Sequence, residues 1–238
     1  MTQRNVLLIT GGGRGVGAAI AAAAANAGYA VAIGYNANAE PATDVAAKIN
    51  QSGGNATAFA ADVRNLTAVE RMFAAVEKDL GPVTALVNNA GFNGGRASVA
   101  ELDPAVLTDV LAVNVVGAFN CTKTALSRMK GRGGAIVNMS SAVVSTGGFR
   151  LAHYAAAKGA VEAFTRSMAW EAAECGVRIN AIAPGAIGGE TVKSSTYAKA
   201  APLQREARPE EVAATVLWLL SDAASYITGA VIPVTGGR

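Results

Sequence analysis

Histidine, cysteine, aromatic residues and charge are all scarce in this sequence. Its 238 residues include one histidine and two cysteines, and only 5% are aromatic and 16% charged. Cys121 and Cys175 lie too far apart for a metal-ligand pair or a disulfide framework, so we expect no metal site and a cytoplasmic protein. The 20 lysines and arginines are scattered without a basic run, which argues against a nucleic-acid partner.

Two apolar segments near the start of the chain do not fit a signal peptide or a membrane helix. The apolar run Val6–Ile9 stops at three glycines, far too early for a signal peptide. An uncharged stretch from Gly15 to Ala39 is rich in alanine and is interrupted by Asn26 and Gly28, whereas a membrane helix needs about 20 predominantly apolar residues. We therefore expect no membrane partner. Hydrophobic residues nevertheless make up 51% of the chain, which is enough for a full core.

Short apolar runs alternate with longer helical patterns along most of the chain. This alternation predicts one α/β domain over residues 1–238, a doubly wound parallel sheet of about seven strands with helices on both faces. The near-continuous apolar character of the runs suits strands buried on both faces. The expected strands are Val6–Thr10, Ala30–Gly34, Ala56–Ala60, Val83–Asn88, Ala135–Met139, Arg178–Ala183 and Val231–Val234, and the expected helices are Ala18–Ala27, Asp44–Gln51, Leu66–Asp79, Val106–Lys130, Tyr154–Glu174 and Glu210–Ser221.

The segment 186–208 breaks this alternation. It contains two adjacent glycines, Gly188 and Gly189, as well as Pro202, and it shows neither a helical nor a strand period. Irregular loops on a rigid scaffold often carry function, so we expect this segment to form a lid over the substrate. A surface insertion without function is the alternative.

A glycine-rich loop joins the first expected strand to the first expected helix. It reads Thr10-Gly11-Gly12-Gly13-Arg14-Gly15-Val16-Gly17. Glycines allow a tight turn and let the backbone approach a pyrophosphate, while the helix N-terminus beyond supplies free N–H groups and partial positive charge. Such a loop alone is weak evidence, but its place between strand and helix favours a dinucleotide site over a plain turn.

The end of the second strand bears on which dinucleotide binds. Proteins that prefer NAD usually place an acidic residue there for the ribose 2′-hydroxyl, but this strand ends at Tyr35 and Asn36, and the nearest acid is Glu40. A 2′-phosphate would meet no acid at Asn36, and Arg14 of the glycine loop could reach it. We therefore expect NADP(H) in preference to NAD(H). A solvated loop charge is the plain alternative for Arg14.

Tyr154 and Lys158 are spaced so that one helix face carries both side chains. Tyrosine has an ordinary pKa of about 10 and is a poor acid near neutral pH. An ammonium group about 5 Å away would lower that pKa by about 2 units at an effective dielectric constant of about 20. The pair therefore predicts a tyrosine tuned to protonate an alkoxide, although this spacing also arises by chance in helices.

Several motifs in the same order make the chain similar to the short-chain dehydrogenases/reductases over essentially its whole length. The family's Thr-Gly-x3-Gly-x-Gly loop is matched by Thr10, Gly11, Gly15 and Gly17, and its Asn-Asn-Ala-Gly motif by residues 88–91. The catalytic serine of the family stands thirteen residues before its tyrosine. The resemblance implies a Rossmann-like cofactor domain with a catalytic tetrad of Asn114, Ser141, Tyr154 and Lys158.

The resemblance also implies a role for each tetrad residue. Tyr154 would be the general acid in carbonyl reduction and the base in the reverse direction, and Ser141 would hold the substrate oxygen. Lys158 would lower the tyrosine pKa and bind the nicotinamide ribose, and Asn114 would position a water that links the lysine to solvent. Contacts to the cofactor would come from Gly11, Arg14, Gly15, Val16, Gly17, Asn36, Asp62, Val63, Asn88, Ala90, Gly91, Tyr154, Lys158, Pro184, Gly185 and Ile187.

Two positions depart from the family pattern. Gly189 stands where the family often has a threonine, and Thr191 lies two residues further on, which puts the geometry of the lid in doubt. Near the end of the chain, the family's Asp-Gly-Gly is replaced by Thr235-Gly236-Gly237. Neither change touches the tetrad.

The function that the resemblance implies is NADP(H)-dependent reduction of a small-molecule ketone such as a 3-oxoacyl thioester. A sugar or polyol dehydrogenase is an alternative, and a cofactor-binding module without catalysis is disfavoured because all four tetrad members are present. The family also implies a homo-oligomer, specifically a tetramer. Outside the tetrad, we expect His153 not to be catalytic, because neighbours on a helix point in different directions, and Ser140 to make strand-end hydrogen bonds.

Overall fold

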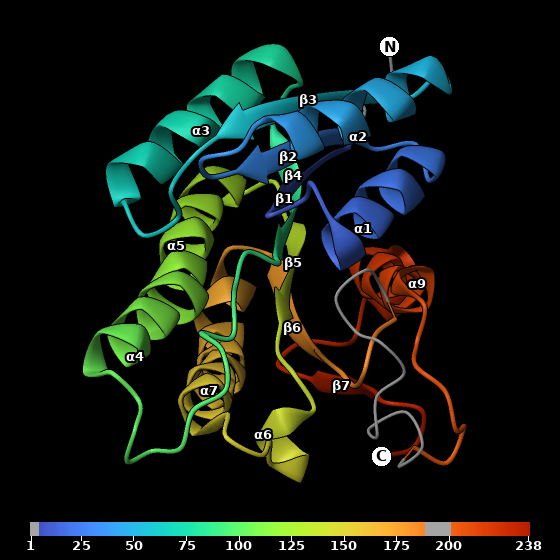
Figure 1. Ribbon diagram of the computed structural model, residues 1–238. Coiled ribbons are helices and arrows are strands. Elements are labelled where there is room, and N and C mark those ends of the chain that lie inside the picture. Colours follow the sequence, from blue (N-terminus) through green and yellow to red (C-terminus); the bar gives the residue numbers. More distant parts are fainter. Residues whose placement is uncertain (1–4, 189–200) are drawn as a thin grey trace.

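The computed structural model describes residues 5–188 and 201–238. Within them, seven parallel strands form one sheet in the order β3-β2-β1-β4-β5-β6-β7 (Figure 1). The predicted doubly wound α/β fold is therefore confirmed. The strands are β1 (Val6–Thr10), β2 (Ala30–Tyr35), β3 (Asn55–Ala60), β4 (Val83–Asn88), β5 (Gly134–Met139), β6 (Val177–Pro184) and β7 (Val231–Val234).

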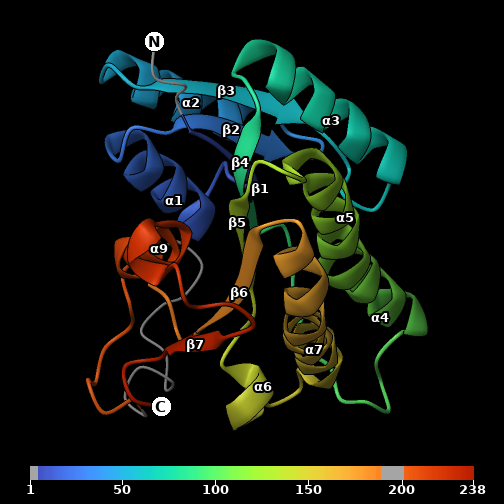
Figure 2. The same cartoon turned by 180° about the vertical axis from the view of Figure 1, so that it is seen from behind.

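Helices cover both faces of this sheet. One face carries α1 (Gly15–Asn26), α2 (Glu40–Gln51) and α9 (Pro209–Leu220), and the other carries α3 (Leu66–Asp79), α4 (Pro104–Leu111), α5 (Gly117–Met129) and α7 (Ala152–Glu174), as the two opposite views show (Figures 1 and 2).

β1 contributes to both layers of core. Leu7 and Ile9 pack in the apolar cluster beneath α1 and α9, while Val6 and Leu8 pack in the cluster beneath α3 and α5. This alternation follows from the two-residue period of a strand, and it explains why all five residues of β1 are buried. The order of strands reverses between β1 and β4, and in such sheets a ligand crevice opens beyond the carboxyl ends of the strands at that point.

The expected continuous helix Val106–Lys130 is wrong at its centre. The chain forms α4 and α5 with a π-helical turn, Ala112–Val116, between them. Asn114 explains the wider turn. Its side-chain Nδ2 donates a hydrogen bond to the Val110 carbonyl oxygen at 2.9 Å, and in an α-helix that oxygen would accept from the backbone N–H of Asn114 instead. Such turns inside helices are frequently found at functional sites.

Other boundaries also differ from those expected. α2 begins at Glu40 instead of Asp44, because Pro41 suits the first helical turn. The short helix α6 (Val143–Thr146) was not expected, since four residues are too few to show a helical period. It follows β5 and lies on the same side of the molecule as the C-terminus in both views (Figures 1 and 2).

Together, α4, the π-helical turn and α5 form one continuous helical segment, Pro104–Met129. This segment has 26 residues and is, by length and composition, long and apolar enough to cross a membrane. Its inner face packs on β4, α3 and α7 as a core helix of the sheet. Lys123 and Arg128 lie on it, and Arg128 forms an ion pair with Glu77 of α3. These contacts are those of a helix built into an α/β core.

The lid expected over 186–208 is described only at its two ends, and Gly189 and Thr191 lie outside the described residues. Ile187 and Ala207 form a parallel bridge, and the N–H of Gly188 donates to the Ala207 carbonyl oxygen at 2.8 Å. The segment therefore leaves and rejoins the sheet domain at one place, next to the ends of β6 and β7.

Candidate active site

Three predicted catalytic side chains meet where β5 ends and α7 begins. Ser141 follows β5, and Tyr154 and Lys158 lie one turn apart on α7. The Tyr154 hydroxyl and Ser141 share a hydrogen bond, and the Lys158 Nζ lies 5.6 Å from the centroid of the Tyr154 ring. The structure thus brings together the phenol, the hydroxyl and the ammonium group that the sequence spacing suggested.

The pKa of Tyr154 does not move in the expected direction. Burial raises it above its ordinary value, and the hydrogen bond with Ser141 lowers it by a smaller amount. Burial dominates because a phenolate loses more hydration energy than a neutral phenol when water is removed. The expectation that Lys158 lowers this pKa is therefore corrected: in this structure Tyr154 is a phenol that holds its proton at neutral pH.

Lys158 is one of the few buried charged residues, with 4% of its surface exposed. Its Nζ donates a hydrogen bond to the Met139 carbonyl oxygen at 2.8 Å. Burial lowers the pKa of this amine to about 8, because the ammonium form is the one that loses hydration. An amine with that pKa can gain or release a proton close to neutral pH.

Asn114 is held rigidly beside Lys158. Its Nδ2 donates to the carbonyl oxygens of Val110 and Phe92, both at 2.9 Å. Its Oδ1 is buried and has no hydrogen-bond partner among the described residues. A Cβ atom placed on Gly91 would lie 2.4 Å from this oxygen and 3.4 Å from the Lys158 Nζ. Gly91 therefore keeps open the space that Asn114 and Lys158 both face.

The glycine loop is clamped by residues at the end of β4. The Thr10 hydroxyl accepts hydrogen bonds from the N–H groups of Asn89 and Ala90, both at 3.0 Å. The Asn89 amide donates to the carbonyl oxygens of Thr10 and Gly11 at 3.1 and 2.8 Å. Asn89 was expected only as part of a motif, and the structure makes it the residue that fixes this loop.

Close packing explains the glycine at the start of α1. A Cβ on Gly17 would lie 2.4 Å from the Gly11 carbonyl oxygen and 2.7 Å from the Asn89 amide nitrogen, which is closer than real Cβ contacts allow. Arg14 immediately precedes α1 in an extended conformation and is exposed. Arg14 therefore lies at the N-terminus of α1, and Gly15, Val16 and Gly17 form its first turn, three residues before the expected start at Ala18.

A groove of about 350 Å³ runs along the carboxyl ends of β1 to β4. Six of the predicted cofactor residues line it, and so do Tyr35, Arg64, Phe92 and Val113, which the sequence analysis did not single out. The six predicted residues are Gly11, Asn36, Asp62, Val63, Ala90 and Gly91.

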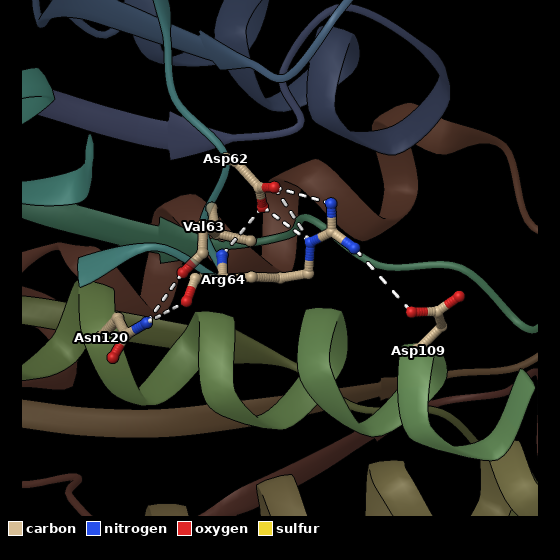
Figure 3. A network of polar contacts seen from close by, with 5 residues as sticks. All are labelled: Asp62, Val63, Arg64, Asp109 and Asn120. Atoms are coloured by element: carbon tan, nitrogen blue, oxygen red, sulfur yellow. Dashed lines mark hydrogen bonds and ion pairs between the residues drawn. The ribbon is translucent and has the colours of Figure 1, made fainter. Parts of the chain in front are cut away.

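Asp62 forms an ion pair with Arg64, a residue that the sequence analysis missed (Figure 3). The Arg64 guanidinium donates to both Asp62 carboxylate oxygens, at distances between 2.7 and 3.0 Å, and its Nη1 lies 3.9 Å from Asp109 of α4. These contacts lower the pKa of Asp62 below its ordinary value. Beneath them, Asn120 of α5 donates to the carbonyl oxygens of Val63 and Arg64 at 3.0 and 3.2 Å. The strand-end turn is therefore fixed to α4 and α5.

Asn88 is not among the residues that line the groove, and its side chain makes structural contacts. Its side chain is buried, and Nδ2 donates to Asn138 Oδ1 at 2.8 Å and to Thr122 Oγ1 at 3.0 Å. Asn138 in turn donates to Thr165 at 2.9 Å. The side chain points to the α5 and α7 side of the sheet because it alternates with its neighbours along β4. It ties β4 and β5 to both helices.

A second cavity, of about 400 Å³, opens at Ser141. The predicted residues Pro184, Gly185 and Ile187 line it at the end of β6 and just beyond, together with α6 and the ends of the predicted lid. Gly91 of the first groove faces Lys158 and Asn114, and Ser141 of this cavity bonds to Tyr154. The tetrad therefore lies between a groove that suits a dinucleotide and a cavity that suits a smaller molecule.

The two polar residues next to the tetrad have supporting contacts. His153 is 4% exposed, and its Nε2 lies 2.7 Å from the Asn93 carbonyl oxygen. The Ser140 hydroxyl donates to Glu162 Oε1 at 2.8 Å. Both side chains hold neighbouring segments to α7.

Comparisons with known proteins agree with this arrangement. The enoyl-(acyl carrier protein) reductase family model matches residues 11–238. The uncharacterized oxidoreductase YgfF of Escherichia coli K12 is 40% identical over 98% of this chain and 99% of that protein. The acetoacetyl-CoA reductase of Rhizobium meliloti is 39% identical over 98% of both chains. A crystal structure from Sinorhizobium meliloti 1021, described as a short-chain alcohol dehydrogenase, superposes with a TM-score of 0.92 at 34% identity, covering 98% of this chain and 95% of that one.

Proposed function

Because the chain belongs to the short-chain dehydrogenase/reductase family, we propose that this oxidoreductase uses NADP(H) to reduce a ketone, with Tyr154 as the proton donor. The observation that carries the proposal is the contact between Tyr154 and Ser141 at the junction of the two cavities. A proton donor and a second hydroxyl that face the same point are what carbonyl reduction requires.

The groove fits a nicotinamide dinucleotide by its shape and its donors. Gly11, Ala90 and Gly91 give it a floor with no side chain larger than a methyl group, and the first turn of α1 has backbone N–H groups that a helix leaves available for a pyrophosphate. The buried Asn114 Oδ1 is an acceptor that faces the same space as Gly91. When bound, the nicotinamide supplies or accepts the hydride.

The protein's own residues handle the proton. Ser141 holds the carbonyl oxygen by a hydrogen bond, and Tyr154 gives its proton to that oxygen as negative charge develops. The raised pKa of Tyr154 keeps this proton in place before the reaction. Lys158, with a pKa of about 8, then passes a proton from solvent toward the tyrosine, and the unpartnered Asn114 Oδ1 would accept a hydrogen bond from the water that supplies this proton.

Two features support NADP(H) in preference to NAD(H). β2 ends at Tyr35, and the exposed residue after it, Asn36, presents an amide to the groove where a carboxylate would repel a 2′-phosphate. Arg14 is exposed at the glycine loop and offers a guanidinium for the same group.

A ketone with an acyl chain, such as a 3-oxoacyl thioester, is the substrate that we propose. Leu151, Ile187, Leu203 and Val234 give the second cavity apolar walls. The acetoacetyl-CoA reductase that matches nearly the whole chain is consistent with such a substrate.

We also propose a homotetramer, supported by Val116, Phe119 and Trp170, which expose apolar surface on the α5 and α7 side. Gel filtration at the mass of a monomer would contradict it.

A turnover panel with NADPH and NADH tests these proposals. It includes β-ketoesters, cyclic ketones and, in the oxidative direction with NADP⁺ or NAD⁺, aldoses. We expect the ketones to be reduced, and NADPH to bind more tightly than NADH in a fluorescence titration. Turnover of aldoses alone would instead support the sugar dehydrogenase alternative.

A further inference from the structure

Glu162 of α7 is a buried carboxylate that the proposed reaction does not use. It lies one turn beyond Lys158 on the same helix, and 9% of its surface is exposed. An ionised carboxylate loses hydration when it is buried, so it needs polar partners inside the protein. Its Oε1 accepts from the Ser140 hydroxyl at 2.8 Å, and its Oε2 accepts from the Arg166 guanidinium at 3.2 Å. One oxygen of this carboxylate is therefore bonded to the residue next to Ser141.

The bond to Ser140 belongs to a series that joins the end of β5 to α7. Four successive residues, 138 to 141, each contact a different residue of that helix. The contacts are Asn138 with Thr165 at 2.9 Å, the Met139 carbonyl oxygen with Lys158 at 2.8 Å, Ser140 with Glu162, and Ser141 with Tyr154. The contact proposed for catalysis, between Ser141 and Tyr154, is thus directly adjacent to the one that Glu162 makes.

Backbone bonds hold the same segment to the neighbouring strand. The N–H of Ser140 donates to the Ile182 carbonyl oxygen of β6, and the N–H of Ala142 donates to the Pro184 carbonyl oxygen, both at 2.8 Å. These bonds fix the segment along the sheet, whereas the Ser140 side chain fixes it to α7. A second contact of the Ser140 hydroxyl, to the Lys158 carbonyl oxygen, is 3.5 Å long. The bond to Glu162 is shorter and has an ionised acceptor, so it is the stronger of the two.

We propose that Glu162 is a positioning residue of the active site, which acts through Ser140 to set the distance between the Ser141 hydroxyl and the Tyr154 phenol. A carboxylate suits this role because a hydrogen bond to an ionised acceptor is shorter and stronger than a neutral one. The inference rests on the proposed ketone reduction, in which both hydroxyls must meet one carbonyl oxygen. A misplacement of about 1 Å in such an arrangement can lower the rate by about 100-fold.

Removing the carboxylate should lower kcat more than it weakens binding. In Glu162→Ala the Ser140 hydroxyl loses its acceptor, and we expect kcat for a β-ketoester to fall by about 10- to 100-fold. The KM for the ketone and the Kd for NADPH should each change by less than about threefold. Glu162→Gln keeps an oxygen that can accept from Ser140, so its kcat should return to within about threefold of wild type.

Ser140→Ala removes the other half of the same bond and serves if Glu162→Ala does not fold. It should lower kcat by a similar factor, and the double variant should lose no more than the larger single loss. Glu77→Ala is the matched control, because Glu77 is also a partly buried carboxylate paired with an arginine, Arg128. It lies on α3, which contributes none of the described residues that line either cavity. An equal fall of kcat in Glu77→Ala, or additive losses in the double variant, would overturn the proposal.

A spectroscopic measurement keeps the positioning role distinct from the proposed reaction. In protein containing tyrosine labelled with ¹³C at Cζ, Tyr154→Phe identifies the Tyr154 resonance, and Ser141→Ala shows where it lies without the hydrogen bond. Glu162→Ala should move the resonance toward the Ser141→Ala position, and Glu162→Gln should leave it near that of wild type. If no ketone is reduced but the resonance moves in this way, the proposed reaction fails and the positioning role stands. If ketones are reduced but Glu162→Ala keeps the wild-type kcat or leaves the resonance in place, the positioning role fails alone.

Discussion

The Nζ of Lys158 donates a hydrogen bond to the carbonyl oxygen of Met139 at 2.8 Å. Met139 is the last residue of β5, and Ser140 and Ser141 follow it directly. One turn further along α7, Glu162 accepts a hydrogen bond from Ser140 at 2.8 Å. The strand end that presents Ser141 is therefore fixed at two points to the helix that presents Tyr154, so the distance between the two hydroxyls is set by the scaffold.

Removing the buried amine should change how stability depends on pH. The folded pKa of Lys158 is about 8, lowered by burial from 10.5, so between these values the unfolded chain holds a proton that the folded protein has lost. Burying the ammonium group lowers the free energy of unfolding, and this loss is fully present below pH 8. As pH rises from 8 to 10.5 the loss disappears, which raises the free energy of unfolding by about 3 kcal/mol. The free energy of unfolding of wild type minus that of Lys158→Met should therefore increase from pH 7 to pH 10.

Denaturant unfolding of the two proteins at pH 7, 8.5 and 10 measures this difference. The titration of Cys121 occurs in both proteins and cancels. A difference that stays constant with pH would show that Lys158 is not buried as a charged group.

The glycine at position 17 should be irreplaceable. In Gly17→Ala the new Cβ would lie 2.4 Å from the Gly11 carbonyl oxygen, so the clamped loop must shift, and we expect NADPH binding to weaken by about tenfold or more. Gly159→Ala is the matched control, because its Cβ would meet the nearest atom of Val144 at 3.9 Å. That variant should stabilise α7 by up to about 1 kcal/mol and leave NADPH binding unchanged. Equal NADPH affinity in both variants would argue against close packing at the loop.

Asn88 should prove to be a structural residue. Asn88→Ala removes its hydrogen bonds to Asn138 and Thr122, and we expect the free energy of unfolding to fall by about 1–3 kcal/mol while the Kd for NADPH is unchanged. Asn36 is exposed in the groove. Asn36→Ala should therefore raise the Kd for NADPH and leave the free energy of unfolding unchanged. A weaker Kd with unchanged stability in Asn88→Ala would restore its predicted cofactor contact.

Arg14 should discriminate between the two dinucleotides. Arg14→Gln removes the guanidinium at the glycine loop, and we expect the Kd for NADPH to rise by about tenfold while that for NADH hardly changes. Arg132→Gln, an exposed charge in the loop before β5, controls for a general effect of net charge. Equal loss of NADPH and NADH affinity would mean that Arg14 does not contact the 2′-phosphate.

The sequence predicted the scaffold well because buried parallel strands leave an unambiguous signal. All seven expected strands match within two residues, since each is a short apolar run next to glycine or polar residues. The spacing between Ser141, Tyr154 and Lys158 likewise placed three side chains together, because the end of β5 and the start of α7 meet at one edge of the sheet.

Features that depend on tertiary contacts could not be predicted in this way. At the π-helical turn, the Asn114 side chain donates both to the Val110 carbonyl oxygen within the helix and to the carbonyl oxygen of Phe92, which is 22 residues distant, and the second contact depends on the fold. The raised pKa of Tyr154 depends on how completely the fold removes water from it. Arg64 was missed although it lies two residues from Asp62, because a single arginine in a loop carries no pattern that marks its partner.

The proton-donating role of Tyr154 is the claim that most of this account depends on, and Tyr154→Phe tests it most directly. The variant keeps the ring and removes only the hydroxyl, so the Kd for NADPH should match that of wild type. We expect kcat for reduction of a β-ketoester to fall by about 10²–10⁴-fold, the usual contribution of acid–base assistance. A Tyr154→Phe protein that binds NADPH normally and reduces the ketone at the wild-type rate would contradict the account.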